Sequence, residues 1–454
     1  MNDLSYFHLN SITGRANLLE SKILNRLSTV GIIGLGYVGL PLATTIAKTG
    51  FRVIGFDVDA VKVNKLNAGT SHIEAVTCGT LGELISRNLF KASEDMQELA
   101  SCDIICICVP TPLSKQREPD LSFVTDTGHA IASQLRRDQL IILESTTYPG
   151  TTDEVLKPIL ETAGLVAGSD FFMGYSPERE DPGNKHFTTA AIPKVVSGDG
   201  LIAQHLVETF YGTFIERVVP VSSIKTAEVV KITENVFRAV NIALINELKV
   251  IYTAMGIDVW EVIEAAKTKP FGYMPFYPGP GLGGHCIPVD PFYLTWKSRE
   301  FELPTRFIEL AGEINQNMPR YVVARLEEAL DSKFGLAASQ ATVLVIGAAY
   351  KKNVPDVRES PSLKIMELLD RKISSLAYHD PFVSSLSLGH DGAGLSYESV
   401  ELTIERIAAS DAILILTDHD CIDYDNIASH ARLVVDTRNA LRSRNIACKR
   451  LVNA

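Results

Sequence analysis

A cysteine beyond the middle of the chain, Cys286, follows a run of glycines and precedes an aspartate, Asp290. The stretch is Gly279-Pro280-Gly281-Leu282-Gly283-Gly284-His285-Cys286-Ile287-Pro288-Val289-Asp290. Glycine lets a backbone approach a ligand closely and take positive φ angles. A lone cysteine is more often a packing residue, but a cysteine in an apolar core needs no such loop. The pattern indicates an exposed thiol nucleophile with a carboxylate four residues on.

A glycine fingerprint near the N-terminus predicts a dinucleotide site. Gly34-Leu35-Gly36-Tyr37-Val38-Gly39 directly follows a buried-strand pattern and opens a helical one. This context favours a cofactor site over a glycine turn that binds no ligand. Gly34 permits the tight turn, Gly36 lets the pyrophosphate approach the backbone, and Gly39 allows close packing of helix and strand. The helix N-terminus, with Tyr37 and Val38, supplies amide donors for the phosphates.

The acidic residue that ends the next strand pattern indicates which dinucleotide is used. Asp57 is expected to accept hydrogen bonds from the adenosine ribose hydroxyls. Asp59 is close by, and no basic residue stands just after Asp57. A 2′-phosphate would be repelled there, so the sequence predicts NAD in preference to NADP.

Further polar residues occur where chemistry could use them. Lys231 and Asn235 are four residues apart in a long apolar helical pattern, so they project from one face. Such a pair is hard to explain as solvated surface, although a salt-bridged lysine at a domain seam is an alternative. Glu178 follows a strand pattern, where the active-site groups of parallel sheets gather. Lys351 and Arg358 supply cations of the kind that a nucleotide diphosphate requires.

The elements that must position these residues alternate between strand and helix patterns in two stretches of the chain. Strands are expected at 29–33, 51–56, 104–109, 140–143, 171–175 and 194–197, and again at 341–346, 375–379, 412–416 and 432–435. This order is typical of doubly wound parallel sheets. The predicted fold class is α/β, with two Rossmann-like doubly wound α/β domains joined by a long central helix and a helical middle domain.

The central helical pattern runs from Ser223 to about Met255 without glycine or proline. Its apolar residues cover most faces, so the helix must be buried on more than one side. The pattern predicts a helix that joins two domains and also packs against a second subunit, in a homodimer or a higher homo-oligomer. A second helical pattern lies near 304–330, and a short one near 18–27.

Length and composition narrow the function classes. A chain of 454 residues predicts two or three domains. The net charge of −11 gives no global attraction for nucleic acid or anionic lipid. No secretory signal and no apolar stretch of roughly 20 residues is present in the sequence. We therefore expect a soluble, cytoplasmic protein that binds neither nucleic acid nor membrane.

The cysteines favour reduced thiols and no metal. There are seven, without a Cys-x-x-Cys pair, as expected in a cytosol. Cys102, Cys106 and Cys108 lie in or next to an apolar run and are predicted to be strand and core residues. Asp418-His419-Asp420 could suggest a metal site, but it has no fourth ligand nearby and is predicted to be a loop.

Taken together, these motifs resemble those of the nucleotide-sugar 6-dehydrogenases, the UDP-glucose/GDP-mannose dehydrogenase family. The resemblance extends from Thr29 to Asn439 and rests on motifs in the same order: Gly34–Gly39, Val109–Pro112, Glu144–Thr147, Ser176–Glu178, Lys231 to Asn235, Gly279–Asp290, Lys351 to Arg358 and Asp436–Arg438. It implies oxidation of a sugar C6 alcohol to a carboxylate in two hydride transfers, with two NAD per sugar. Cys286 would attack the intermediate aldehyde to give a thiohemiacetal, whose oxidation gives a thioester that water hydrolyses.

The resemblance also implies roles for the other residues. Lys231 and Asn235 would stabilise negative charge on the C6 oxygen, and Lys231 would lower the pKa of the thiol. Asp290 would orient or activate water and Glu178 is a candidate general base, with their division of labour left open. The expected cofactor contacts further include Thr111, Ser145, Thr146 and Arg358. The expected substrate contacts are Glu178, Arg179, Lys231, Asn235, Tyr277, Gly281, Lys351 and Arg438.

The form of the cysteine loop bears on the sugar. Val289 stands where glucose-type members carry lysine. In this respect the loop is similar to that of the bacterial branch that acts on UDP-N-acetylhexosamines. Within that branch the similarity points to UDP-N-acetylglucosamine, oxidised to UDP-N-acetylglucosaminuronic acid for surface polysaccharide. The galacto and manno epimers and UDP-glucose are alternatives. A non-catalytic nucleotide-sugar binding protein and a 3-hydroxyacid-type dehydrogenase are alternatives of other kinds.

The resemblance divides the chain into four parts. We predict an N-terminal extension at 1–27 and an NAD-binding Rossmann domain at 28–220. A central helical and dimerisation domain with the cysteine loop would follow at 221–330, and a UDP-sugar-binding domain at 331–454.

Overall fold

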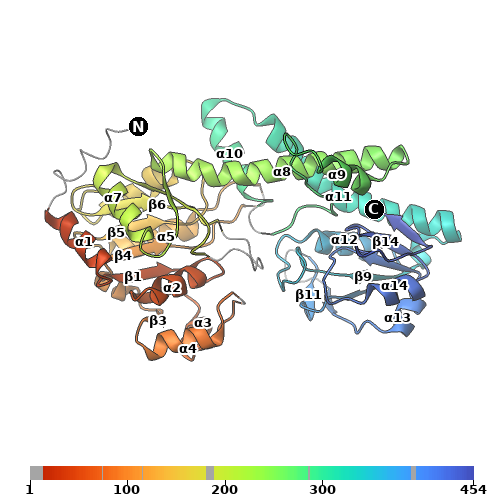
Figure 1. Ribbon diagram of the computed structural model, residues 1–454, viewed down its shortest axis with the longest axis horizontal. Coiled ribbons are helices and arrows are strands. Elements are labelled where there is room, and N and C mark those ends of the chain that lie inside the picture. The colour runs from red at the N-terminus through yellow and green to blue at the C-terminus, as the bar shows by residue number, and fades with distance from the viewer. Residues whose placement is uncertain (1–13, 74, 115, 180–188, 285–286, 390–394) are drawn as a thin grey trace. The chain divides into compact units, whose positions relative to one another are not determined.

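The computed structural model describes residues 14–73, 75–114, 116–179, 189–284, 287–389 and 395–454. Its residues divide into two compact units, Met1–Glu234 with Trp296–Glu302, and Asn235–Thr295 with Leu303–Ala454. Figure 1 labels the elements of each unit. Among the described residues, no helix is both long enough and apolar enough to span a bilayer.

The first unit is built on a sheet of eight strands in the order β3-β2-β1-β4-β5-β6-β7-β8. The strands are β1 (Thr29–Ile33), β2 (Arg52–Phe56), β3 (Phe90–Ser93), β4 (Ile104–Ile107), β5 (Leu140–Leu143), β6 (Phe172–Tyr175), β7 (Lys194–Gly198) and β8 (Val218–Pro220). The run from β3 to β6 is parallel, as expected for its predicted strands β1, β2, β4, β5 and β6, whereas β3 was not predicted. Strand β7 is antiparallel to β6, and β8 is parallel to β7.

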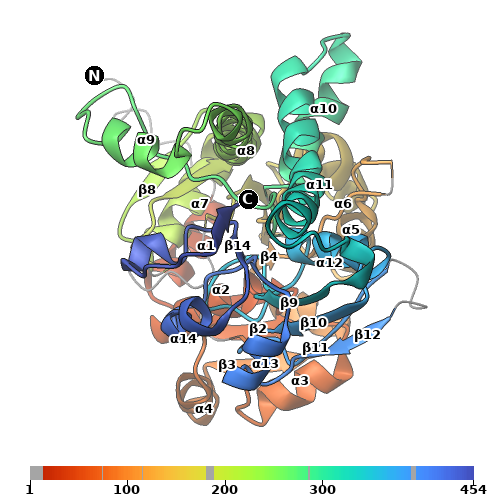
Figure 2. The ribbon, with the colours of Figure 1, turned by 90° about the vertical axis from the view of Figure 1, so that its right-hand side faces the viewer.

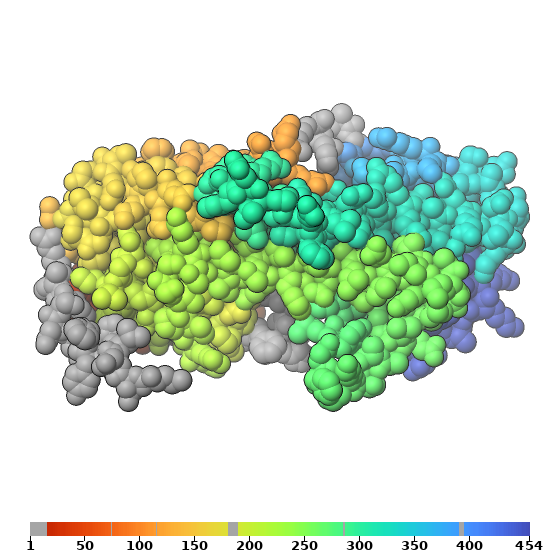
Figure 3. All heavy atoms as spheres, turned by 90° about the horizontal axis from the view of Figure 1, so that it is seen from above, coloured from red at the N-terminus to blue at the C-terminus, as the bar shows by residue number. Residues whose placement is uncertain are grey.

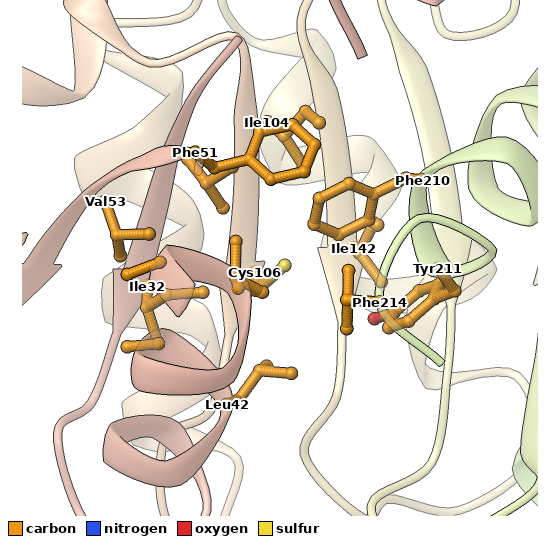
Figure 4. Close-up of a cluster of buried hydrophobic side chains, with 14 of the residues drawn as sticks. Ile32, Leu42, Phe51, Val53, Ile104, Cys106, Ile142, Phe210, Tyr211 and Phe214 are labelled. Carbon is orange, nitrogen blue, oxygen red and sulfur yellow. The ribbon is translucent and has the colours of Figure 1, made fainter. Parts of the chain in front are cut away.

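Helices cover both faces of this sheet because its central strands are apolar throughout. Strands β4 and β5 are buried along their whole length, as expected for parallel strands with helices on both sides. One face packs against α1 (Gly14–Leu24), α2 (Gly39–Lys48), α4 (Cys78–Ser86) and α7 (Gly200–Tyr211). Figure 4 shows part of this core, with Ile32, Phe51, Cys106 and Phe210. The other face packs against α5 (Ser122–Ala132), α6 (Lys157–Glu161) and the start of α8 (Ile224–Ala254).

The helix α1 belongs to the predicted N-terminal extension. Both of its ends lie a few residues earlier than the ends of the predicted segment 18–27. Beyond its C-terminal end, Arg26 takes a positive φ of 61°. Its residues Ala16, Leu19 and Ile23 are buried in the same core as α7. The Lys22 ammonium also lies 3.0 Å from the Asp103 carboxylate. The described part of the extension is therefore part of the first unit's core, and residues 1–13 lie outside the described residues.

The second unit contains a parallel sheet of five strands in the order β10-β9-β13-β14-β15. These are β9 (Thr342–Ile346), β10 (Ser375–His379), β13 (Ala412–Ile415), β14 (Val434–Asp436) and β15 (Leu451–Asn453), and a small antiparallel pair joins β11 (Ser385–Ser387) to β12 (Ser396–Glu398). One face packs against α11 (Arg306–Phe334) and α12 (Pro361–Asp370), and the other against α13 (Ile404–Ala409) and α14 (Tyr424–His430) (Figure 2). The fold-class prediction of two Rossmann-like sheets is confirmed.

Three further α-helices are α3 (Ala60–Asn67), α9 (Val259–Ala266) and α10 (Asp290–Ser298), and the described residues also form short 3-10 or π turns at Met96–Ser101, Thr152–Leu156, Arg299–Phe301, Ala338–Gln340 and Arg442–Arg444. The long predicted helix is present as α8, within one residue of the expected bounds. Cys102 and Cys106 are buried and Cys108 is partly buried, in agreement with their predicted place in strand and core.

Candidate active site

The glycine fingerprint forms a tight turn between β1 and α2. Gly34 has a φ of +92°, and a Cβ there would lie 2.6 Å from the carbonyl oxygen of Cys108. A Cβ at Gly39 would lie 1.8 Å from the carbonyl oxygen of Gly34, so only glycine fits. A Cβ at Gly36 would meet nothing within 4 Å. The turn therefore leaves the Gly36 backbone open at the start of α2, and this shape fits a dinucleotide pyrophosphate.

The carboxylate of Asp57 lies beside this turn and already accepts three hydrogen bonds. Its donors are the amides of Leu35 at 3.0 Å and Asp59 at 3.1 Å, and the Lys62 ammonium at 2.8 Å. Lys62 was missed because the sequence argument considered only residues directly after Asp57. The signal was Asp59, which caps α3 through the Val61 and Lys62 amides and so turns Lys62 back toward Asp57. No basic residue stands just after Asp57 in the sequence, but a cation five residues on reaches its carboxylate.

Three of the expected cofactor contacts, Thr111, Ser145 and Thr146, lie at the same edge of the sheet. Ser145 follows β5 and donates from its hydroxyl to the carbonyl of Val109, which follows β4, at 2.7 Å. The Thr111 hydroxyl donates to the carbonyl of Thr146 at 2.7 Å. Because β1, β4 and β5 are parallel neighbours, these residues and the glycine turn follow carboxyl ends of adjacent strands.

Lys231 and Glu178 form a buried pair in the first unit. The Lys231 ammonium donates to the main-chain carbonyl of Glu178 at 2.6 Å and lies 3.3 Å from its carboxylate. Helix α8 positions Lys231. The segment after β6 positions Glu178, and Ser176 in that segment donates to the carbonyls of Leu143 through its amide and of Val195 through its hydroxyl. Neither Lys231 nor Glu178 is more than 6% exposed.

A pocket in the first unit brings Glu178 together with the cofactor-loop residue Val38. Its lining also includes Glu144 and Lys194, for which the sequence argument gave no role. Lys194 is the one cation of strand β7, and this break in an apolar pattern was the signal for it. Arg179 also lines the pocket, while its guanidinium is paired with Glu234 at 2.6 Å.

Helix α8 also anchors the loop after Ser145–Thr147. Glu228 is fully buried and accepts hydrogen bonds from the amides of Gly150 and Thr152 and from the Thr152 hydroxyl. Burial raises the pKa of the Glu228 carboxyl to about 7, against the lowering effect of these donors. These hydrogen bonds join Gly150 and Thr152 to α8 at Glu228, which is three residues before Lys231.

In the second unit, the amide of Asn235 donates to the Asp290 carboxylate. Arg238 in turn donates to the Asn235 side-chain oxygen. Asn235 and Asp290 are both buried, and Asp290 is the first residue of α10. Cys286, the predicted nucleophile, lies outside the described residues. The structure thus brings together two of the predicted catalytic residues, which the sequence places 55 positions apart.

The glycines before Cys286 are required by packing within the second unit. A Cβ at Gly279 would lie 2.7 Å from an Arg438 guanidinium nitrogen, and one at Gly283 would lie 2.6 Å from the Cβ of Tyr350. Gly281 and Gly284 have positive φ angles of 142° and 83°. The positive φ angles expected from the sequence are present at Gly281 and Gly284. Close packing against protein side chains is a further reason for glycine in this run, and the expected approach to a ligand stays a prediction.

The predicted substrate cations also belong to the second unit. Arg438 is partly buried, its guanidinium donates to the carbonyl of Leu416 at 2.8 Å, and burial lowers its pKa. Arg358 is paired with Asp356 at 2.6 Å, and its own carbonyl accepts the Gly284 amide. Lys351 lies in the same loop after β9 as Arg358. The remaining residue predicted there, Tyr277, donates to Glu264 at 2.9 Å.

His419 serves the core of the second unit. Its ring nitrogen Nε2 lies 3.0 Å from the Asp380 carboxylate, and its Nδ1 accepts the Asn353 amide. Both His419 and Asp380 are buried. Within the described ranges, no group of three or more His, Cys, Asp or Glu side chains could hold a metal ion.

Three family models match the chain in order. They are the NAD binding domain of the UDP-glucose/GDP-mannose dehydrogenase family at residues 28–215, its central domain at 225–317 and its UDP binding domain at 344–443. The chain belongs to the UDP-glucose/GDP-mannose dehydrogenase family. It is therefore an oxidoreductase of the NAD-dependent nucleotide-sugar dehydrogenases, and NAD is its cofactor.

Relatives in the UDP-glucose/GDP-mannose dehydrogenase family cover most of the chain. UDP-N-acetyl-D-glucosamine 6-dehydrogenase of Pseudomonas aeruginosa is 38% identical over 364 residues, which are 80% of this chain and 85% of the relative. UDP-N-acetyl-D-mannosamine dehydrogenase of Pyrococcus horikoshii is 34% identical over 420 residues, 91% and 96% of the two chains. The solved structure of UDP-D-ManNAc dehydrogenase from Pyrococcus horikoshii has a TM-score of 0.84 at 32% identity and covers 94% and 98%.

Proposed function

We propose that the protein oxidises the C6 alcohol of UDP-N-acetylglucosamine to UDP-N-acetylglucosaminuronic acid, a four-electron oxidation that uses two NAD. The observation that supports this chemistry is the buried contact between Lys231 and Glu178. Glu178 lines the same pocket as Val38, a residue of the glycine turn expected to bind the cofactor. A buried ammonium provides charge stabilisation for an oxyanion, and a carboxylate provides a base.

In this proposal the cofactor, when bound, accepts hydride from C6 in each oxidation. Lys231 and Asn235, one helical turn apart on α8, stabilise negative charge on the C6 oxygen. The Cys286 thiolate adds to the aldehyde carbon and forms a thiohemiacetal, which holds the carbon as a tetrahedral hydride donor. After the second oxidation a thioester remains. Water then adds to its carbon as Glu178 or Asp290 takes a proton, and the C–S bond breaks to release the carboxylate and the thiolate.

The mechanism requires that Cys286 forms a covalent bond to the substrate. A role in binding alone would not be enough. Cys286→Ala should abolish uronate formation while NAD and UDP-sugar still bind. Near-normal turnover in this variant would contradict the proposed mechanism. A non-catalytic sugar-binding protein would instead form no NADH in the wild type.

The choice of sugar rests on the loop form with Val289 and on relatives that act on UDP-N-acetylhexosamines by name. Those names include both the gluco and the manno compound, and the proposal selects the gluco one. A site that hydrogen-bonds the acetamido group rejects UDP-glucose strongly, whereas contact with its methyl alone discriminates by only about 1–3 kcal/mol. The test is kcat/KM for UDP-N-acetylglucosamine, its galacto and manno epimers and UDP-glucose. A best rate with another sugar would overturn this choice.

In the same proposal, residues 28–220 bind NAD, 221–330 carry the thiol loop and form the dimer, and 331–454 bind the UDP-sugar. Helix α8 supports a dimer because it exposes large apolar side chains, namely Val229, Phe237, Leu244, Val250 and Ile251, and Met255 just after its end is exposed too. The yellow-green and green spheres of this segment are on the face that Figure 3 shows. Apolar surface left in water costs about 25 cal/mol per Å². Sedimentation at low protein concentration tests this part of the proposal, and a stable, active monomer would contradict it.

A further inference from the structure

Two consecutive carbonyls after β6 are each held by a buried lysine. The Lys231 ammonium donates to the carbonyl of Glu178 at 2.6 Å, and the Lys194 ammonium donates to the carbonyl of Pro177 at 3.1 Å. The two peptides that flank the Cα of Glu178 are therefore each held by a cation, the preceding one by Lys194 and the following one by Lys231. Only one of these lysines has a role in the chemistry proposed above.

Lys194 is itself fixed by a network that reaches three strands and a helix. Its ammonium lies 2.5 Å from the carboxylate of Glu144, which directly follows β5. The other oxygen of Glu144 accepts the hydroxyl of Tyr211, the last residue of α7. The exposed fractions of the three residues are small, at 8% for Lys194, 1% for Glu144 and 0% for Tyr211. Each polar group has a partner, so Lys194 has little freedom to move.

The network borders the candidate active site. Glu144 and Lys194 line the same pocket as Glu178, together with Val38 of the cofactor turn. A displacement of Pro177 would be passed directly to Glu178, which is the next residue. Misplacement of a reacting group by about 1 Å can cost on the order of 100-fold in rate.

We propose that Lys194 is a positioning residue for Glu178, holding the Pro177 carbonyl so that the Glu178 carboxylate is set for thioester hydrolysis. This role rests on the proposed function, and on Glu178 as the base of that step. In the step, a water oxygen bonds to C6, Glu178 takes the water proton, and the C6–S bond breaks with the electron pair leaving on Cys286. Loss of Lys194 should therefore slow hydrolysis and leave both oxidations intact.

The variant for the test removes the buried charge pair as a whole, since either partner left alone would be an uncompensated charge. It is Lys194→Met combined with Glu144→Gln, in which the Gln oxygen can still accept the Tyr211 hydroxyl. The matched control is Tyr211→Phe, which cuts the same network but keeps Lys194 on Pro177. NAD binding and circular dichroism check that each variant is folded.

Rapid mixing with NAD and UDP-N-acetylglucosamine gives the decisive readout. The double variant should form a burst of two NADH per active site, followed by steady turnover about 10- to 100-fold slower than wild type. Glu178→Gln should show the same burst, the KM values should be little changed, and Tyr211→Phe should match the wild type. Mass spectrometry should detect the thioester during the slow phase.

The outcomes separate this role from the proposed function. A wild type that yields other than two NADH per sugar overturns the proposed function, and the role of Lys194 with it. A wild-type yield of two, with unchanged turnover or with a lost burst in the double variant, overturns the positioning role alone.

Discussion

The Lys231 ammonium contacts both the main-chain carbonyl and the carboxylate of Glu178. One cation thereby fixes the position of the candidate base and remains next to it. In the proposed mechanism the Lys231 charge stabilises the C6 oxygen, and replacement with methionine removes that charge. We expect Lys231→Met to lower kcat by about 100- to 1,000-fold, the usual cost of losing one oxyanion donor.

Lys225 on the same helix provides the control for this prediction. It is half exposed and pairs with Glu154 at the surface, where ion pairs contribute little. Lys225→Met should leave kcat near the wild-type value. Equal kcat values for the Lys231 and Lys225 variants would contradict the assigned role.

Asp57 and Lys62 together should decide the preference between NAD and NADP. The wild type should prefer NAD strongly, because Asp57 repels a 2′-phosphate. In Asp57→Asn the Lys62 ammonium loses its carboxylate partner and becomes able to pair with that phosphate. The ratio of kcat/KM for NADP over NAD should rise at least about tenfold, which corresponds to roughly 1.4 kcal/mol.

Adding Lys62→Met to Asp57→Asn should reverse the gain with NADP. Steady-state kinetics of the wild type and both variants with each cofactor test the prediction. An equal gain with and without Lys62 would show that this cation does not reach the ribose.

Gly279→Ala should weaken UDP-sugar binding. The new Cβ would lie 2.7 Å from an Arg438 guanidinium nitrogen, so the guanidinium has to shift, and its hydrogen bond to the Leu416 carbonyl opposes that shift. We expect a higher KM for the UDP-sugar and an unchanged KM for NAD. Gly82→Ala is the control, because a Cβ there meets nothing within 4 Å. If the KM for the UDP-sugar stayed the same in Gly279→Ala, Arg438 would have no part in binding it.

Glu228 should make the stability of the protein depend on pH. Its pKa is raised from an ordinary 4.5 to about 7. A carboxyl raised in the folded state contributes stability that is present below about pH 4.5 and lost as the pH rises through about 7. The wild type should therefore lose up to about 3 kcal/mol of unfolding free energy relative to Glu228→Gln over this range. Denaturant unfolding of both proteins at pH 5 and 8 measures it, and parallel pH profiles would refute it.

The strands that sequence could predict are those whose signal is local. β5 and β10 have the predicted bounds, and each is a short uninterrupted strand pattern. β3 and β15 were missed because they are short and depend on pairing with β2 and β14. The reversal of β7 against β6 is also a property of pairing, which no single segment encodes.

The residues of the candidate site could also be predicted where the sequence signal is local, and not where it depends on residues far along the chain. The glycine turn, Lys231 and Glu178 could be identified from motifs. The contact between Lys231 and Glu178 could not be predicted in this way. Lys194 was missed because its partners come from other strands. The positive φ angles of the glycine run before Cys286 could be expected from sequence. Its packing against Tyr350 and Arg438 could not, because those side chains lie far along the sequence.

The central claim is that one active site oxidises C6 twice. Its most direct test is the number of NADH molecules formed for each UDP-N-acetylglucosamine consumed, with the product weighed by mass spectrometry. The proposed function predicts two NADH and a uronate. One NADH with an aldehyde product, or no NADH at all, would contradict it.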